Sequence, residues 1–333
     1  MTPIQPICII DGLSWPVMQN ILSVTIKDSR GTKGDTLTFK VSNPDYMFSE
    51  PAEGTILTPH LGYNNTRLVK MGDFMIDEIE HDEQQAIFMT IKANSQYHHE
   101  NSVKAPRDKK YTGKTLGAIF GEIAGRNGYT SEVDPKLASI KVTHIVQKSQ
   151  SDTAFASELA AKYDGYVKYQ DGKMIVRDGN TTSGVVLIKK GTPTTISAGG
   201  LVIDTAIGIG SKRKIRGKYK SVKCPWRNMD QGKTKYEIIG SGEPVYKISG
   251  TKVHTKAEAK QMATKKFAEL ERGTAELKAV KLPGHPNIRA EMELVTSNFH
   301  PNTNGNWVIE EVTHNYTNGG GYTTSINKAE PKK

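Results

Sequence analysis

The segments GDFMIDEIEH (residues 72–81) and GNWVIEEVTH (residues 305–314) are two versions of one sequence. They share Gly, Ile, Glu and His at matching places, and a constant offset of 233 residues (305−72 and 314−81) aligns them without a gap. Each is followed by a polar turn and a second strand-like run, at 87–91 and at 322–326, and the second hairpin loop is two residues longer. This self-similarity predicts one β-module used twice.

The chain has 333 residues, a length that suits two to four domains. No run approaches the roughly 20 apolar residues that cross a bilayer, and the N-terminus has no basic start followed by an apolar stretch. The two cysteines, Cys8 and Cys224, argue against a disulfide framework and for synthesis in a reducing compartment. We expect no membrane association.

The pattern of the chain predicts a mainly β fold with α/β insertions. Short alternating runs up to residue 97 are typical of a sandwich or small barrel. Apolar residues at helical spacing then predict helices over 112–127 and 151–163, and a capping box at Thr255 opens a third helix, to Leu270. An Asp171-Gly172 dipeptide predicts a type I′ hairpin turn.

These elements divide the chain into four parts, two of which we expect to be copies of one β-module. The parts are a first β-module at 1–97, an α/β insertion at 98–195, a discontinuous second β-module at 196–224 and 273–333, and a helix-containing insertion at 225–272.

The stretch Thr112-Gly113-Lys114-Thr115 imitates the end of a phosphate-binding loop. That motif requires a glycine five positions before Gly113, where this chain has Asp108, and Lys109-Lys110-Tyr111 supplies no glycines for a backbone cradle. We therefore interpret the stretch as the beginning of a helix.

No other group of residues predicts a catalytic, cofactor-binding or metal site. His98 and His99 are adjacent and point apart on any regular element, and neither cysteine has a neighbouring cysteine or histidine pair. His81 with His314 could be imagined as paired ligands, and Glu78 with Glu311 as a glycosidase carboxylate pair. Both pairs occupy equivalent positions of the repeat, so duplication explains them. Gly319-Gly320-Gly321 lies in a hairpin loop and has no following helix. We expect no enzyme activity.

The net charge of +10 is partly concentrated in KRKIRGKYK (residues 212–220). Alternation there places Lys214, Arg216, Lys218 and Lys220 on one face of a strand. No aromatic stacking platform or recognition helix accompanies them, so we expect no specific nucleic-acid binding. We predict that these side chains are solvated or lie against acidic partner surfaces, away from any symmetry axis.

Several short pieces of the sequence occur in a specific order along the chain. They are GDTLTF (34–39), NPD (43–45), SDTAFASELA (151–160) before Gly165, RGTA (272–275), LPGHP (282–286), and GNWV (305–308) running to His314 and its glycine-rich hairpin. In this order they resemble the phage late control protein D family, the baseplate hub of contractile phage tails and of tail-like bacteriocins. The resemblance spans nearly the whole chain.

The resemblance implies a homotrimer in which each subunit contributes two similar β-barrels, so that six barrels form a pseudo-hexameric ring. Such a ring is a symmetry adaptor that joins the sixfold tail tube to the threefold central spike. The implied partners are tail tube or tube-initiator proteins and the spike protein, with tape measure and baseplate wedge proteins as further candidates. The implied location is the baseplate of the virion or bacteriocin particle, after synthesis in the bacterial host cytoplasm.

Three other functions stay open at this point. They are a tail-associated cell-wall-degrading protein, the hub portion of a type VI-like secretion spike, and a basic nucleic-acid-binding protein. Because the sequence stops shortly after the second repeat copy, we expect neither a fused spike nor a muralytic domain.

Overall fold

The structure is a computed structural model and describes residues 4–83, 87–95, 105–179, 181–190, 194–196, 202–203, 208–213, 218–228, 231–249, 253, 255–272 and 275–332. The chain is mainly β, as the sequence predicts, with five α-helices among the described residues. We group the elements into a first β-set, a second β-set, a first α/β unit and a second α/β unit, each defined below.

The first β-set contains the elements up to Asn94. They are β1 (Pro6–Asp11), α1 (Trp15–Gln19), β2 (Ile21–Ser29), η1 (Gly31–Lys33), β3 (Thr36–Ser42), η2 (Pro44–Tyr46), β4 (Ile56–Tyr63), β5 (Val69–Lys70), β6 (Phe74–Asp82) and β7 (Phe88–Asn94). The main strands are ordered β1-β4-β6-β7-β3-β2, and all their pairings are antiparallel. Alternate residues of β3, namely Leu37, Phe39 and Val41, point into a core that they share with Phe74 and Ile91.

The second β-set is assembled from segments on both sides of the second α/β unit. Its strands are β13 (Val185–Lys189), β14 (Thr194–Ile196), β15 (Val202–Ile203), β16 (Gly208–Arg213), β20 (Ala275–Pro283), β21 (Glu293–Ser297), β22 (Gly305–Thr317) and β23 (Gly321–Pro331). Its order is β13-β21-β22-β23-β20-β16, with β14 and β15 continuing beyond β13. Leu277, Val280, Leu294, Ile309 and Ile326 form the centre of its core.

The two β-sets have the same strand order, so the duplication inferred from the sequence is confirmed. β6 and β7 correspond to β22 and β23, and the register shifts between Ile76 and Glu78 in one hairpin and between Ile309 and Glu311 in the other. These bulges lie 233 residues apart, at equivalent positions, and a β-bulge is a specified feature of a strand. The sets differ in the direction of one pairing, since β1 pairs antiparallel with β4 whereas β13 pairs parallel with β21.

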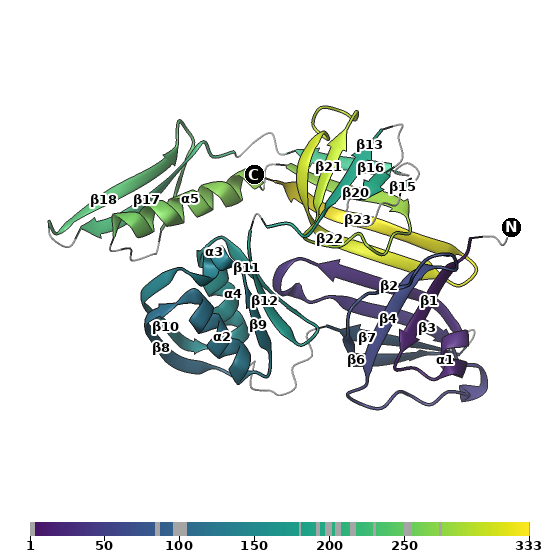
Figure 1. Ribbon diagram of the computed structural model, residues 1–333. Coiled ribbons are helices and arrows are strands. Elements are labelled where there is room, and N and C mark those ends of the chain that lie inside the picture. The colour runs from purple at the N-terminus through teal and green to yellow at the C-terminus, as the bar shows by residue number, and fades with distance from the viewer. Residues whose placement is uncertain are drawn as a thin grey trace.

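A direct strand pairing joins the two β-sets. β2 pairs antiparallel with the C-terminal half of β22, from Ser23 opposite Thr317 to Ser29 opposite Glu311. Figure 1 shows the long β22–β23 hairpin, in yellow, leaving its own set and lying alongside β2 of the first. The strands of the two β-sets thus form one continuous sheet, and the predicted barrels are not seen as closed barrels within the described residues.

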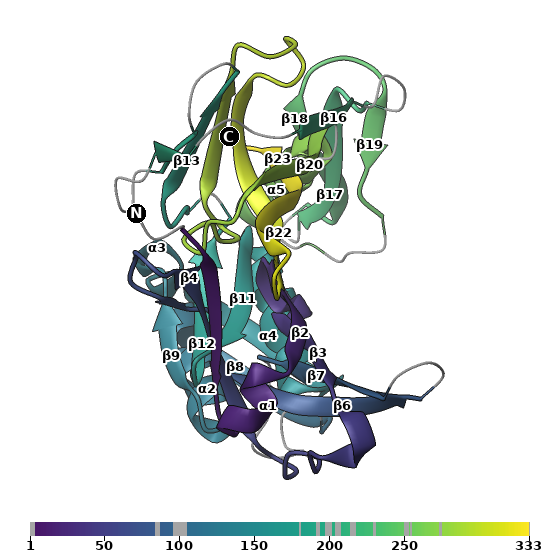
Figure 2. The ribbon, with the colours of Figure 1, turned by 90° about the vertical axis from the view of Figure 1, so that its right-hand side faces the viewer.

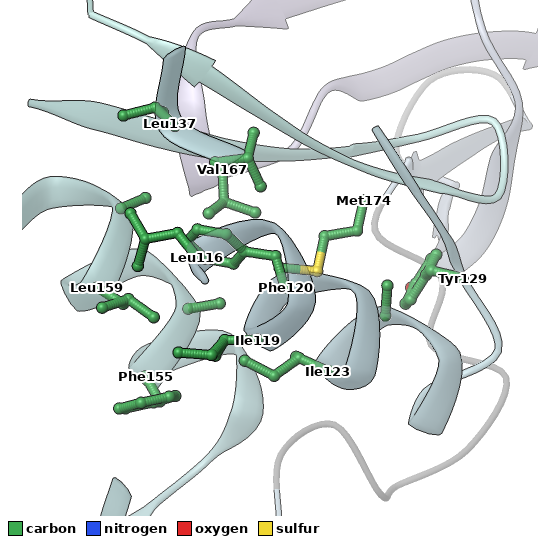
Figure 3. Close-up of a cluster of buried hydrophobic side chains, with 14 of the residues drawn as sticks. Leu116, Ile119, Phe120, Ile123, Tyr129, Leu137, Phe155, Leu159, Val167 and Met174 are labelled. Carbon is green, nitrogen blue, oxygen red and sulfur yellow. The ribbon is translucent and has the colours of Figure 1, made fainter. Parts of the chain in front are cut away.

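The first α/β unit lies between the two β-sets in sequence. It contains β8 (Arg107–Thr115), α2 (Leu116–Arg126), β9 (Thr130–Val133), α3 (Pro135–Ala138), β10 (Lys141–Gln150), α4 (Asp152–Lys162), β11 (Gly165–Gln170) and β12 (Lys173–Asp178). The Ser151 hydroxyl accepts a hydrogen bond from the backbone of Ala154 and caps α4, as predicted. Figure 3 shows its core, where Phe120 of α2 lies among side chains from α4, β11 and β12.

The second α/β unit packs one long helix against a small sheet. It contains β17 (Ser221–Asn228), β18 (Lys233–Gly240), β19 (Val245–Lys247) and α5 (Lys256–Arg272). The Thr255 hydroxyl accepts a hydrogen bond from the backbone of Glu258, which confirms the predicted helix start. Val222 and Cys224 of β17 pack on Ala259 and Ala263 of α5.

Two local predictions need separate comment. Asp171 and Gly172 both have positive φ, at 50° and 69°, so the β11–β12 turn is of type I′ as predicted. The helix predicted over 112–127 begins later, since residues up to Thr115 belong to β8 and pair with β10. The β-ladder can take these four residues because no apolar residue of the helical stripe precedes Leu116.

Candidate functional site

Where the two β-sets meet the first α/β unit, a buried group of charges replaces apolar packing. The Nζ atom of Lys168, on β11, lies 2.7 Å from Oδ1 of Asp28 and 3.2 Å from Oδ2 of Asp35. Lys168, Asp28 and Asp35 are at most 5% exposed. The backbone N–H groups of Ala290 and Ser29 donate to Asp28 and Asp35 respectively. One lysine from the α/β unit therefore pairs with two carboxylates of the first β-set. One of them, Asp28, also contacts the second β-set through Ala290.

Burial acts to raise the pKa of both carboxyls, but the two net shifts have opposite signs. Burial acts to raise the pKa of Asp28, but the charges of Lys168 and Arg289 outweigh it, and the pKa falls below its ordinary value. Burial raises the pKa of Asp35, and the neighbouring charge of Asp28 raises it further. Asp35 is thus the carboxyl that takes up a proton first as the pH falls.

We predict that Asp35→Asn removes one component of the pH dependence of stability. Folding raises the pKa of Asp35 from 3.8 to about 7, so the folded protein binds an extra proton between these values and loses stability as the pH rises through this window. Asparagine does not titrate and keeps the oxygen that accepts from Ser29. The free energy of unfolding is measured with urea between pH 4.5 and pH 7.5, which are about the limits of the window. As the pH rises between them, wild type should lose stability relative to Asp35→Asn.

Comparing the two proteins isolates Asp35, because His285, His314 and Glu291 titrate in both. Parallel pH profiles for wild type and variant would contradict the assignment.

Arg30, at the end of β2, contacts the same three parts of the chain. Its Nη1 atom lies 2.6 Å from Oε1 of Glu310 on β22, and its guanidinium carbon lies 4.5 Å from the ring centre of Tyr166 on β11. Its backbone N–H donates to the Glu310 carbonyl. Glu310 is the bulge residue of β22, so the bulge directs a carboxylate and a carbonyl towards Arg30.

A second group of polar contacts joins the two β-sets directly. Arg289 donates to the carbonyls of Lys70 and Met71, at 2.7 Å and 3.2 Å, and the Tyr63 hydroxyl donates to the Gly284 carbonyl. Gly284 lies in the LPGHP piece noted above, and a Cβ there would come within 2.1 Å of the Tyr322 ring. Only glycine therefore allows this close approach without moving Tyr322.

The repeated histidines have different environments in the two copies. His314 is fully buried: its Nε2 lies 3.0 Å from the Ile288 carbonyl and its Nδ1 lies 2.8 Å from the Tyr322 hydroxyl. Burial lowers the pKa of His314 to about 3, so it packs as a neutral ring. His81 is exposed and lies 2.8 Å from Glu50. The two are separate side chains on separate hairpins, as duplication predicts.

The repeated glutamates are also on separate hairpins, each with its own cation. Glu78 lies 3.1 Å from Lys92, and Glu311 lies 3.0 Å from Lys27. Cys8 is half-buried, Cys224 is buried, and both are free thiols. Among the described residues no group of three or more His, Cys, Asp or Glu could hold a metal ion, and no helix is long and apolar enough to span a membrane. His98, His99 and Glu100 lie outside the described residues.

The phosphate-loop imitation is the junction between β8 and α2. The Thr115 hydroxyl accepts from the backbone of Ala118 and caps α2, so the stretch leads into a helix as predicted, although its residues up to Thr115 belong to β8. Lys114 lies 2.7 Å from Glu122 of α2. The lysine therefore pairs with a carboxylate of its own unit.

The basic stretch at 212–220 is not one continuous strand. β16 ends at Arg213, Lys214 and Arg216 lie outside the described residues, and Lys218 and Lys220 form an irregular segment before β17. The chain leaves the second β-set here to enter the second α/β unit, so the ladder cannot continue. The prediction that four cations share one strand face is therefore wrong for Lys218 and Lys220.

A cleft of about 590 Å³ separates the two α/β units. Phe155 and Leu159 of α4 line one side, and Tyr246 and Met262 line the other. The Nζ atom of Lys162 on α4 lies 3.2 Å from Oε1 of Glu258 on α5, and this ion pair bridges the cleft. The cleft is thus a space between packed units, closed at one point by an ion pair.

Comparison with known proteins shows relatives of one kind. No protein-family model matches the chain. The sequence is 28% identical over 358 residues to a protein named "Probable baseplate hub protein" of Escherichia phage P2, covering 93% of this chain and 88% of that protein. A protein of the same name from Escherichia phage 186 is 27% identical over 344 residues, covering 92% and 87%. The chain is a homologue of these phage baseplate hub proteins.

Solved structures share the fold at much lower identity. The 43 kDa tail protein of prophage MuSo2 from Shewanella oneidensis has a TM-score of 0.72 at 10% identity, covering 99% of this chain and 98% of that one. The E. coli c3393 protein, a component of the type VI secretion system, has a TM-score of 0.59 at 11% identity, covering 98% and 77%. The fold is therefore that of phage tail proteins and their secretion-system counterparts.

Sequence reasoning did not identify the buried charges at Asp28, Asp35, Lys168 and Arg30. Asp35 is part of the GDTLTF piece, and a carboxylate directly before a buried strand is a signal that could have been followed. Its partner Lys168 lies in a hairpin that looks like an ordinary amphipathic one. Nothing in the sequence connects the two.

Proposed function

We propose that this protein is the structural baseplate hub of a contractile phage tail or a tail-like bacteriocin. The single observation that carries the proposal is the pair of β-sets with one strand order, in a chain whose homologues are named baseplate hub proteins over most of their length. The repeated histidines and glutamates and Lys114 each have a structural partner among the described residues, which favours a role in assembly over catalysis.

We further propose that the hub is a homotrimer, in which the two β-sets of each chain act as barrel-like modules of a pseudo-hexameric ring. Three copies of a doubled module present six similar surfaces to a sixfold tail tube and three to a central spike. Tube, spike, tape measure and wedge proteins are the proposed partners. The proposed location is the baseplate of the assembled particle.

The proposed domains follow the four parts expected from the sequence, with two limits moved. β13 pairs with β21, which favours starting the second barrel-like module near Val185 instead of residue 196. Ser221 to Cys224 begin β17, which packs on α5, so they fit the second insertion better than the barrel.

The mass of the purified protein tests the trimer. Chains of 36.6 kDa should assemble into particles of about 110 kDa, measured by native mass spectrometry. A strict monomer at every concentration, both free and when extracted from particles, would contradict the hub proposal. Zymography on peptidoglycan separates the hub from a wall-degrading protein, since a hub should leave the gel uncleared.

A further inference from the structure

The inner edge strands of the two β-sets correspond residue by residue. β2 lies beside β3 in the first set, and β16 lies beside β20 in the second. Leu37 of β3 and Leu277 of β20 occupy equivalent places, because each pairs with an alanine of the repeated hairpin. Ile26 pairs with Leu37 and Ser211 with Leu277, so Lys27 corresponds to Lys212.

The surroundings of these two strands differ in one respect. The outer edge of β2 is paired with β22 of the second β-set. Among the described residues β16 pairs with β20 alone, and its outer edge meets no strand. In the same way β22 has β2 along its distal half, whereas β6 pairs with β4 only at Phe74 and Met75. Each β-set thus offers one half of a pairing that already exists once within the chain.

We propose that β16 of one copy of this chain pairs antiparallel with the distal half of β6 of a second copy, as β2 pairs with β22 within the chain. This inference rests on the proposed hub function and names the surface by which the copies join. Figure 2 shows the distal end of the β6–β7 hairpin extending away from the rest of the chain. An extended strand edge of this kind is a template for pairing with another chain.

The correspondence fixes the register of the proposed pairing. Lys27 pairs with Thr313, and these residues correspond to Lys212 and Glu80, so Lys212 of one copy should lie opposite Glu80 of the next. By the same step Ser211 should lie opposite His81. Lys27 also forms a 3.0 Å ion pair with Glu311, whose counterpart is Glu78. Lys212 would therefore face two carboxylates.

Charge and burial both support this partner. The distal half of β6 carries four acidic residues, and β16 ends in adjacent cations. The acidic residues are Asp77, Glu78, Glu80 and Asp82. Opposite charges across paired strands stabilise the pairing, and Lys92 already bridges Glu78 and Glu80 from the other side. Val312 of β22 is fully buried, whereas its counterpart Ile79 is only half-buried, as expected of a strand whose neighbour comes from another molecule.

Repetition of this one step joins the copies head to tail. Such a heterologous contact produces a ring if the rotation closes, and otherwise an open filament. Around such a ring, the β2–β22 pairing within each chain would alternate with the β16–β6 pairing between neighbouring chains. The two contacts are then equivalent in strand order and register.

Cysteine cross-linking tests the register. Directly opposed residues of antiparallel strands have Cα atoms about 4.5–5.5 Å apart, within the range that a disulfide spans. The double variant Lys212→Cys/Glu80→Cys, oxidised and run on a non-reducing gel, should give covalent dimers and trimers and no longer ladder. The matched control Lys148→Cys/Glu80→Cys, whose lysine is exposed on β10, should stay at the level of wild type with its native Cys8 and Cys224.

Charge exchange provides the second measurement. Lys212→Glu and Glu80→Lys should each raise the concentration at which trimers dissociate by roughly tenfold in sedimentation velocity, and the double exchange should restore it to within about twofold. Lys148→Glu makes the same change in net charge elsewhere and should leave assembly unchanged.

The outcomes separate this inference from the hub proposal. Trimers that form in wild type but neither cross-link nor respond to Lys212→Glu would overturn the proposed pairing and leave the hub proposal standing. A wild-type protein that never assembles would overturn both.

Discussion

Lys168→Met should lower the free energy of unfolding by about 3–5 kcal/mol, because it leaves the buried carboxylate of Asp28 without its nearest cation. Lys168 lies within 3.2 Å of both Asp28 and Asp35, and all three are nearly inaccessible to solvent. Methionine fills a similar volume, so the loss measures the charge and not a cavity. Urea unfolding at pH 7 gives the difference.

Lys173→Met on the neighbouring strand β12 is the matched control. Lys173 lies 3.6 Å from Glu132, and both side chains are more than 40% exposed. Exposed pairs of this kind contribute about 0–1 kcal/mol. Equal losses in the free energy of unfolding for the two variants would show that the burial of Lys168 does not increase its contribution to stability. The loss at Lys168 should also shrink at low pH, where the two carboxyls can protonate.

Phe120→Ala should destabilise the first α/β unit by about 3–5 kcal/mol, since it removes a fully buried ring from the centre of that core. Phe120 is surrounded by Leu116, Leu159 and Met174 from three different elements (Figure 3). Hydrogen exchange of the α2 and β11 amides measures the loss locally.

Amides of β6 provide the internal reference, because β6 belongs to a different core. Phe120→Leu keeps most of the apolar volume and should cost only about 1–1.5 kcal/mol. A change in α2 protection below about 1 kcal/mol for Phe120→Ala would be inconsistent with the observed packing.

Local features of the fold could be predicted from the sequence with good accuracy. The helix starts at Ser151 and Thr255 depend on side chains that cap within three residues, and the turn at Asp171-Gly172 depends on two residues that tolerate positive φ. The repeat is visible in the sequence because both copies keep the same glycine, isoleucine, glutamate and histidine positions. Such signals lie within a few residues of the structure that they determine.

The arrangement of these elements could not be predicted in the same way. Nothing near Ile26 indicates that its strand pairs with residues around His314, and nothing near Lys168 indicates that it faces Asp28 and Asp35. These contacts depend on where distant segments come together. The closure of each β-set into a barrel is implied by the family resemblance, and strand spacing alone does not specify which edges meet.

The pairing of β2 with β22 also bears on when the chain can fold. Thr25 and Asn315 bond to each other across 290 residues, so β2 has no partner along that edge until the ribosome has made β22. At about 5–20 residues per second this interval is roughly 15–60 s, whereas a hairpin such as β6–β7 forms in about 1–10 μs. The edge of β2 therefore waits unpaired throughout this interval. Synthesis of β22 is the event that closes this edge, and it sets the earliest moment at which one copy can offer a finished surface to the next.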